Sequence, residues 1–159
     1  MRKEPTQRIS RKALPVWRFK GALESLFFLS IPVFYGILMY FYDFPQWLLW
    51  VFIGLYGILF LFFVWVIPSV RWRRWRYEVH EQEIDLKYGV FIVRRTLIPM
   101  IRVQHVDTEQ GPLYRRYGLS AVTISTAADV HEIPALTEEV ADNLRDQIAM
   151  LAQTADEDE

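Results

Sequence analysis

A long apolar block dominates the first half of the chain. Between Ser25 and Ile67, 43 consecutive residues include one charged side chain, that of Asp43. The one polar, turn-forming interruption is Asp43-Phe44-Pro45-Gln46, which divides the block in two. The second part, residues 47–67, has 21 residues without a charge, and at about 1.5 Å per helical residue it matches the roughly 30 Å hydrocarbon core of a bilayer. The pattern predicts two transmembrane helices, at about 22–42 and 47–67.

The first of these segments is the shorter one. Its uncharged stretch from Ser25 to Tyr42 has 18 residues and contains Pro32. Glu24 lies at its start, where a carboxylate can stay among the lipid headgroups, so the helix can extend to Ala22. Two buried helices of a soluble core are the alternative, but only about 90 other residues would be left to cover them. A cleaved signal peptide is disfavoured because no small-residue cleavage site follows and a second span comes at once.

Beyond about Trp75 the pattern changes from helical runs to short alternating segments. The alternation on both sides of Glu81-Gln82 predicts a hairpin. Further strands are expected where apolar and β-branched residues alternate or cluster, and Pro99 interrupts one of them. The predicted strands cover residues 75–80, 84–88, 90–98, 101–107, 121–126 and 130–133, with one helical turn at 113–117.

The last part of the pattern is helical. Apolar residues recur from Val140 to Leu151 at the spacing of one helix face. Thr137 can cap this helix, and Glu138 and Glu139 lie at its positive end. These short strands followed by a helix predict a small mainly-β barrel capped by a C-terminal α-helix. The expected fold is thus a two-helix transmembrane hairpin joined to this barrel.

Charge adds an orientation to this organisation. The net charge of −1 is a cancellation, because residues 1–76 carry eleven Lys and Arg against three Asp and Glu, and residues 77–159 carry seven against sixteen. Basic residues flank both spans and are absent from the connecting turn, so the positive-inside rule predicts a multi-pass protein of the inner (cytoplasmic) cell membrane with both termini in the cytoplasm. The predicted regions are a basic segment at 1–21, the spans within 22–67, a cytoplasmic domain at 70–154 and an acidic tail at 155–159, disordered from Asp156 onward.

Several short motifs in the predicted domain occur in an unusual order. They are Arg95-Thr96-Leu97-Ile98-Pro99, Ile101-Arg102-Val103-Gln104, Gln110-Gly111-Pro112-Leu113, Arg116-Tyr117-Gly118-Leu119 and Thr126-Ala127. This order, with the preceding spans, resembles the bacterial pleckstrin-homology-like (PH) domain of YdbS-like membrane proteins. Ala128 departs from it, since the family more often has glycine there. The resemblance implies a PH-like fold, a larger membrane protein with several PH-like domains as partner, and a part in envelope stress or antimicrobial resistance.

We find no pattern in the sequence that is typical of an enzyme. The chain has no cysteine, and its histidines, His80, His105 and His131, have no metal-ligand spacing. Nucleophile, Walker and dinucleotide-binding patterns are missing too. We therefore expect no catalytic residue, no metal and no cofactor.

Two groups of basic residues are candidate binding sites. At the junction after the second span, guanidinium groups can bind lipid phosphates and indoles can lie in the membrane interface; a topology anchor that accepts any anionic headgroup competes with a selective lipid site. This membrane-interface anchor comprises Arg71, Trp72, Arg73, Arg74, Trp75 and Arg76. A second group could gather at one open end of the barrel and bind an anionic headgroup. It comprises Arg94, Arg95, Arg102, Arg115 and Arg116.

The second group has competing explanations. Sixteen acidic residues in the same domain oppose its attraction to an anionic membrane. Arg115 and Arg116 can instead pair with Asp107 or Glu109. Basic residues interleaved with tryptophan could also suggest nucleic acid, but the adjacent membrane explains them better.

Three classes of function remain. The first is a non-enzymatic, membrane-anchored interaction module, and the second is a sensor of anionic lipid headgroups or of an envelope-active compound. Transport is the third, disfavoured because two spans with no internal charge offer no polar pathway. Gly36, Gly54 and Gly57 allow close helix packing, either within the hairpin or in a homo-oligomer.

Overall fold

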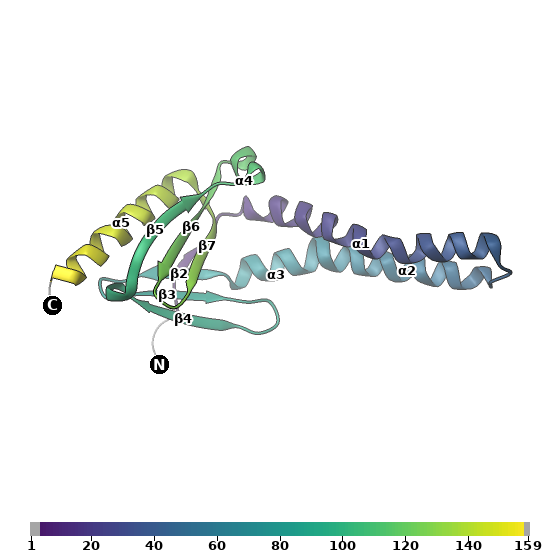
Figure 1. Cartoon of the computed structure of the whole chain (residues 1–159), viewed down its shortest axis with the longest axis horizontal. Helices are drawn as coiled ribbons and strands as arrows, with labels where there is room; N and C mark the ends of the chain where they lie inside the picture. The colour runs from purple at the N-terminus through teal and green to yellow at the C-terminus, as the bar shows by residue number, and fades with distance from the viewer. Residues whose placement is uncertain (1–3, 158–159) are drawn as a thin grey trace. The chain divides into compact units, whose positions relative to one another are not determined.

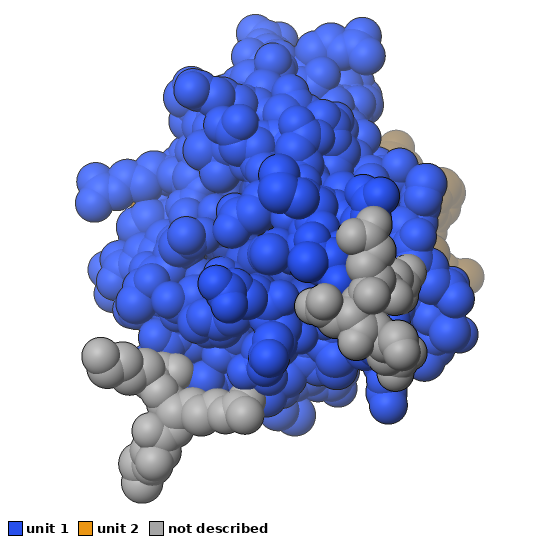
Figure 2. Space-filling model, turned by 90° about the vertical axis from the view of Figure 1, so that its left-hand side faces the viewer, with its two compact units in different colours: residues 1–16, 71–159 blue, residues 17–70 orange. Residues whose placement is uncertain are grey.

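The computed structural model describes residues 4–157. The chain forms two compact units, residues 17–70 and, from both sides of that segment, residues 1–16 with 71–159. Figure 2 shows the second of these, which we call the PH unit, in blue. Each unit is described by itself below.

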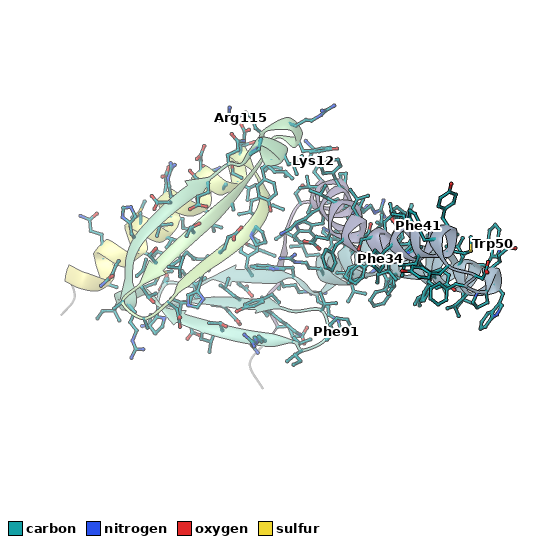
Figure 3. The ribbon with its side chains drawn as sticks, turned by 45° about the vertical axis from the view of Figure 1, so that its right-hand side comes forward. Lys12, Phe34, Phe41, Trp50, Phe91 and Arg115 are labelled. Carbon is teal, nitrogen blue, oxygen red and sulfur yellow. The ribbon has the colours of Figure 1, made fainter. Side chains whose placement is uncertain are left out.

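The apolar block folds as two long helical segments. The first is α1 (Ala13–Phe41), and the second runs without a break through α2 (Gln46–Leu61), the π-helical turn η1 (Phe62–Val66) and α3 (Ile67–Arg74). Each segment has 29 residues and is long and apolar enough to cross a membrane. Their large apolar side chains are exposed, among them Phe34, Phe41 and Trp50 in Figure 3. The two predicted membrane helices are therefore confirmed as apolar helices of sufficient length.

Gly21 marks the closest approach of the two segments. A side chain at this position would place its Cβ 2.5 Å from the main-chain oxygen of Phe63. The rings of Phe28 and Phe63 stack 5.5 Å apart beside it. Phe63 belongs to the π-helical turn, a feature often produced by one extra residue in a helix.

Packing within the hairpin, one of the two uses expected for the other glycines, does not occur at Gly54 or Gly57 in the described residues. A Cβ at either position would meet nothing within 4 Å among the described residues. At Gly36 it would make an ordinary contact, 3.9 Å from Cδ1 of Leu49. Gly21 was overlooked in the sequence because it lies among charged residues before the apolar block.

The PH unit contains two antiparallel sheets and two helices (Figure 1). The first sheet has the order β1-β2-β3-β4, formed by β1 (Gln7–Arg8), β2 (Arg76–Val79), β3 (Glu83–Tyr88) and β4 (Arg94–Pro99). The second has the order β5-β6-β7, formed by β5 (Val103–Glu109), β6 (Leu119–Thr126) and β7 (Val130–Thr137). The remaining elements are the 3-10 turn η2 (Met100–Arg102), the short helix α4 (Pro112–Tyr117) and the C-terminal helix α5 (Glu138–Glu157).

The mainly-β fold with its C-terminal helix is confirmed, but the two sheets do not close into the predicted barrel. The chain leaves the first sheet at Pro99, which has no N–H to donate to a further ladder. It then turns through η2 before β5 begins the second sheet. β4 and β5 are thus joined by the chain and not by hydrogen bonds between strands in the described residues.

The core of the PH unit has buried side chains from both sheets and from α5, among them Ile84 of β3, Ile124 of β6 and Ile148 of α5. β6 is the middle strand of the second sheet, and its first four residues are all buried, so both of its faces are covered. α5 packs against β5, β6, β7 and η2 through Ala141, Leu144 and Ile148. The predicted amphipathic helix is present and continues through Glu157, so it includes the first part of the expected acidic tail. Residues 158–159 lie outside the described residues.

The predicted strand at 90–98 is half wrong. Only its second part, β4, is paired, and residues 89–93 form the loop between β3 and β4. Gly89 begins this loop with a φ of 129°, which L residues rarely adopt. The apolar, β-branched run that suggested a strand is instead exposed.

The segment before α1 completes the first sheet, although its sequence predicts no strand. Gln7 pairs with Tyr77 and Arg8 with Arg76. The adjacent Ile9 side chain is only 3% exposed. Two residues are too few to produce an alternating pattern, so this strand has no signal in the sequence.

Two polar contacts hold the same segment on the sheets. Lys87 Nζ donates to Glu4 Oε1 at 2.5 Å, and this hydrogen bond is the main reason why the pKa of Glu4 lies below its usual value. The N–H of Ser10 donates to the carbonyl of Ala135 at 3.0 Å. Ala135 adopts a left-handed φ of 53° at an irregularity between β6 and β7.

Candidate membrane-interface site

The predicted interface anchor begins on the last turn of α3. Arg71, Arg73 and Arg74 lie there, and all three are exposed. Cations at the C-terminal end of a helix interact favourably with its dipole. They are also among the last residues of the candidate span Gln46–Arg74, and basic side chains at such an end are attracted to anionic headgroups.

Trp72 joins this turn to the N-terminal segment. Its Nε1 donates to the carbonyl of Ile9 at 3.3 Å. The guanidinium carbons of Arg8 and Arg11 lie 6.0 and 5.5 Å from the centre of its ring. Cations at such distances over an indole face are attracted by the ring quadrupole. We call these three residues, Arg8, Arg11 and Trp72, the Trp72 cluster.

Neither arginine of the Trp72 cluster was predicted as a site residue. They are separated from Trp72 by more than 60 positions, and no short motif connects such distant residues. The sequence shows the density of positive charge before the first span. It does not show that β1 pairs with β2, which brings these arginines close to Trp72. Two cations that precede the hairpin thus lie over an indole that follows the apolar part of its second segment.

The other two members of the predicted anchor, Trp75 and Arg76, follow the end of α3. Trp75 is only 4% exposed, and its ring stacks on that of Tyr88 at 5.7 Å with an interplanar angle of 20°. Arg76 is part of β2, opposite Lys87 of β3 and Arg8 of β1. Trp75 therefore packs in the PH unit, and its indole is not available to a lipid.

The second predicted group of arginines is not gathered at one place. Arg94 lies at the start of β4, whereas Arg102 lies in η2, beyond the end of that strand. Arg115 and Arg116 belong to α4, which follows the far end of β5. Figure 3 shows Arg115 well away from Phe91, which precedes β4. Strands of six or seven residues, at about 3.3 Å per residue, separate these positions.

Arg95 of this group has a structural partner. Its Nη2 lies 2.5 Å from Oδ2 of Asp85, and its Nε donates to both carboxylate oxygens at 3.1 Å. The Asp85 side chain is 4% exposed, so the bidentate pair satisfies a buried carboxylate. These hydrogen bonds raise the pKa of Arg95 above its usual value. Arg95 thus forms a structural ion pair with Asp85.

In the described part of the chain, neither Arg115 nor Arg116 forms an ion pair with Asp107 or Glu109, the alternative partners expected from the sequence. Asp107 lies 3.2 Å from Nε2 of His105 instead. Arg102 borders an open groove of about 520 Å³ between β4, η2 and the turn from β6 to β7, with Leu97, Ile101 and His131. This groove contains one of the five arginines.

A metal site requires several ligand side chains close together. Among residues 4–157 no three His, Asp or Glu side chains lie together as metal ligands would. His80 borders a shallow depression with Glu81 and Glu83, whereas His131 lies at the groove beside Arg102. The three histidines therefore belong to separate surroundings.

The two apolar helices and the two-sheet unit with its C-terminal helix together define a membrane-associated protein with a PH-like domain. Residues 26–152 match the family described as Bacterial PH domain, and the chain belongs to this family. Over 158 residues, 99% of each chain, it is 47% identical to the UPF0699 transmembrane protein YdbS of Bacillus subtilis (strain 168).

A second relative is the UPF0699 transmembrane protein YdbT of the same organism. It is 24% identical over 92 residues, which are 54% of this chain and 19% of YdbT. YdbT is thus much the longer protein. No solved structure matches the chain.

Proposed function

We propose that the protein is a non-enzymatic interaction module, anchored in the cytoplasmic membrane by two spans, with both termini in the cytoplasm. The pairing of β1 with β2 supports this topology. Because β1 precedes the hairpin and β2 follows it, the two ends of the hairpin must lie on the same side of the membrane. Two crossings meet that condition, and the basic flanks favour the cytoplasmic side.

The partner in this proposal is a larger membrane protein with several PH-like domains. The observation that carries it is the likeness to YdbT, a longer transmembrane protein with a stretch related to this chain. The family name of YdbS mentions no enzymatic activity, which supports a binding role.

Purification of the tagged, full-length protein from its own cells, at native expression and in mild detergent, tests this proposal. We expect a longer protein of the bacterial PH domain family to copurify in a fixed ratio. A tagged variant without residues 71–159 retains the hairpin and serves as the control for non-specific membrane contacts. Recovery of the full-length protein alone would contradict the proposal.

A sensor of anionic lipid headgroups is the second candidate function. The Trp72 cluster and the exposed Arg71, Arg73 and Arg74 favour it, because they concentrate cations beside the end of a span. Lipid nanodiscs with and without phosphatidylglycerol would test it through the intrinsic fluorescence of Trp72. A Trp72 signal that is the same in both lipids, as compared with Trp72→Phe, would eliminate this candidate.

The proposed role in envelope stress or antimicrobial resistance rests on the resemblance to YdbS-like proteins. Deletion of the gene should lower resistance to membrane-active peptides, and the wild-type gene should restore it. A variant that no longer copurifies with the partner should fail to restore it. Equal resistance with and without the gene, over a panel of such peptides, would contradict this role.

A further inference from the structure

The loop between β3 and β4 exposes three consecutive apolar side chains. Phe91, Ile92 and Val93 are 78%, 74% and 46% exposed. Turns between strands normally contain Gly, Asn, Asp or Ser, which satisfy the turn geometry and water together. A contiguous apolar surface of this kind indicates a partner or a membrane.

The conformation of this loop is set by its first residue. Gly89 has a φ of 129°, and a Cβ at that position would collide with the carbonyl of Ile92. The main chain therefore folds tightly back on itself between β3 and β4. The apolar side chains lie on the outside of this turn, and Figure 3 labels Phe91 at the tip of the hairpin.

Two contacts fix the loop to the end of α3. Nη1 of Arg74 donates to the carbonyl of Val90 at 2.5 Å. The next residue, Trp75, stacks on Tyr88, which precedes the loop. Arg74 is the last residue of the candidate span Gln46–Arg74. The loop therefore stays within one side chain's reach of the end of the helix that contains the second candidate span.

The exposed side chains on both sides of the loop carry positive charge, which favours contact with an anionic leaflet. Arg71, Arg73 and Arg74 are exposed on the helix end that holds the loop, and Arg94 is exposed directly after it. Basic residues of this kind are attracted to the anionic headgroups of a cytoplasmic leaflet, and aromatic rings favour the interface. A bilayer satisfies both the exposed apolar side chains and the surrounding cations.

We propose that the β3–β4 loop is a second membrane contact, in which Phe91 and Ile92 enter the headgroup region of the anionic leaflet and restrict the orientation of the PH unit on the membrane. The contact needs no protein partner, so it is independent of the proposed interaction module. It also assigns a role to a surface that the two spans do not require.

The chain has no cysteine, so single cysteines can report the depth of chosen residues. Full-length F91C and I92C, each labelled with an environment-sensitive fluorophore, would be placed in nanodiscs of phosphatidylglycerol and phosphatidylethanolamine. Ala128→Cys, in the exposed turn between β6 and β7, is the matched control. We expect blue-shifted emission and quenching by lipids with a shallow nitroxide at residues 91 and 92, and quenching by aqueous iodide at residue 128.

A second set of variants tests whether the loop's own apolar surface is responsible. With the label at residue 93, Phe91→Ser together with Ile92→Ser should abolish quenching by the lipid nitroxide. Ile101→Ser, at another exposed apolar position, should leave it unchanged. Iodide quenching at residues 91 and 92 equal to that at residue 128 would overturn the proposal. Protection from both quenchers would overturn it too, because it would indicate a protein cover.

Discussion

Asp85 is the buried charge on which the first sheet depends. Among residues 4–157, the guanidinium nitrogens of Arg95 lie 2.5 to 3.1 Å from its carboxylate oxygens and offset its negative charge. A buried carboxylate left without its donors costs about 1–3 kcal/mol. We expect Arg95→Met to lower the thermal unfolding midpoint of the detergent-solubilised protein, followed by circular dichroism.

The matched control for this prediction is Arg94→Met, which removes an exposed arginine from the neighbouring position. The double variant Asp85→Asn with Arg95→Met should recover part of the loss, because it removes the unpaired charge. An equal midpoint for Arg95→Met and Arg94→Met would show that the pair contributes nothing to stability.

Ionisation of the Tyr77 phenol should lower the stability of the fold at high pH. Burial raises the pKa of this phenol above its model-peptide value of 10.0. In the unfolded chain the phenol ionises first as the pH rises, so folding binds a proton and its contribution to stability is lost above about pH 10. We expect Tyr77→Phe to make unfolding by urea less sensitive to pH between 9 and 11. Tyr117→Phe, in the short helix α4, is the control, and equal pH dependence in both variants would refute this prediction.

Some residues could be assigned from the sequence, and others could not. The basic charges of Arg71, Arg73 and Arg74 beside a span were predictable, because local order determines them. The burial of Trp75 was not predictable from the sequence. Only its stacking on Tyr88, thirteen positions later, shows that the indole packs inside the domain. Likewise, nothing local distinguishes Arg95, which pairs with Asp85, from the exposed Arg94.

At the scale of elements, β1 and its neighbour Ile9 should stabilise the whole PH unit. The side chain of Ile9 is 3% exposed and its carbonyl accepts from Trp72. Truncation of a buried isoleucine to alanine typically costs about 2–5 kcal/mol. We expect Ile9→Ala to lower the free energy of unfolding by that amount, measured by chemical denaturation in micelles.

Gln7→Ala provides the control, because this side chain is exposed in the same strand. The Gln7→Ala variant keeps the main-chain hydrogen bonds to β2, so its free energy of unfolding should change little. If both variants unfold at the same denaturant concentration, the N-terminal segment is not part of the cooperative unit.

Gly21 and Gly54 allow a matched test of helix packing. Both are helical glycines, and alanine is intrinsically favoured over glycine in a helix by about 1 kcal/mol. At Gly21 this gain is opposed by collision with the Phe63 carbonyl, whereas Gly54 has open space. We expect Gly21→Ala to lower the thermal stability of the solubilised hairpin and Gly54→Ala to maintain or raise it. A rise in both variants would contradict the packing described at Gly21.

Elements with a clear period were predictable, and those defined by pairing were not. The helix from Glu138 was evident from its apolar spacing, and the hairpin of β2 and β3 from its alternation. The run at 90–93 has the composition of a strand, but the turn at Gly89 leaves it unpaired. The barrel failed to close because a 3-10 turn after Pro99 separates the sheets, and loop conformation is weakly encoded in residue types.

At the scale of the whole molecule, the proposed topology predicts which residues face each side of the membrane. Single cysteines at Asp43, Thr6 and Gln153 would be treated with a membrane-impermeant maleimide in intact cells. We expect labelling of Asp43→Cys before lysis, and of Thr6→Cys and Gln153→Cys only after it. Ile58→Cys, within a candidate span, should resist the reagent in both states. Labelling of Thr6→Cys in intact cells would contradict the topology.

The sheet formed by β1 and β2 also has a consequence for biosynthesis. Gln7 pairs with Tyr77, a partner that is made 70 positions later. At roughly 5–20 residues per second, the ribosome needs about 4 to 14 s between them. In the proposed topology, the N-terminal strand stays unpaired during that interval while both helices enter the membrane. In that topology, the first sheet can be completed only after the hairpin has been inserted with both ends on one side, so a chain with a misplaced first helix would not complete this sheet.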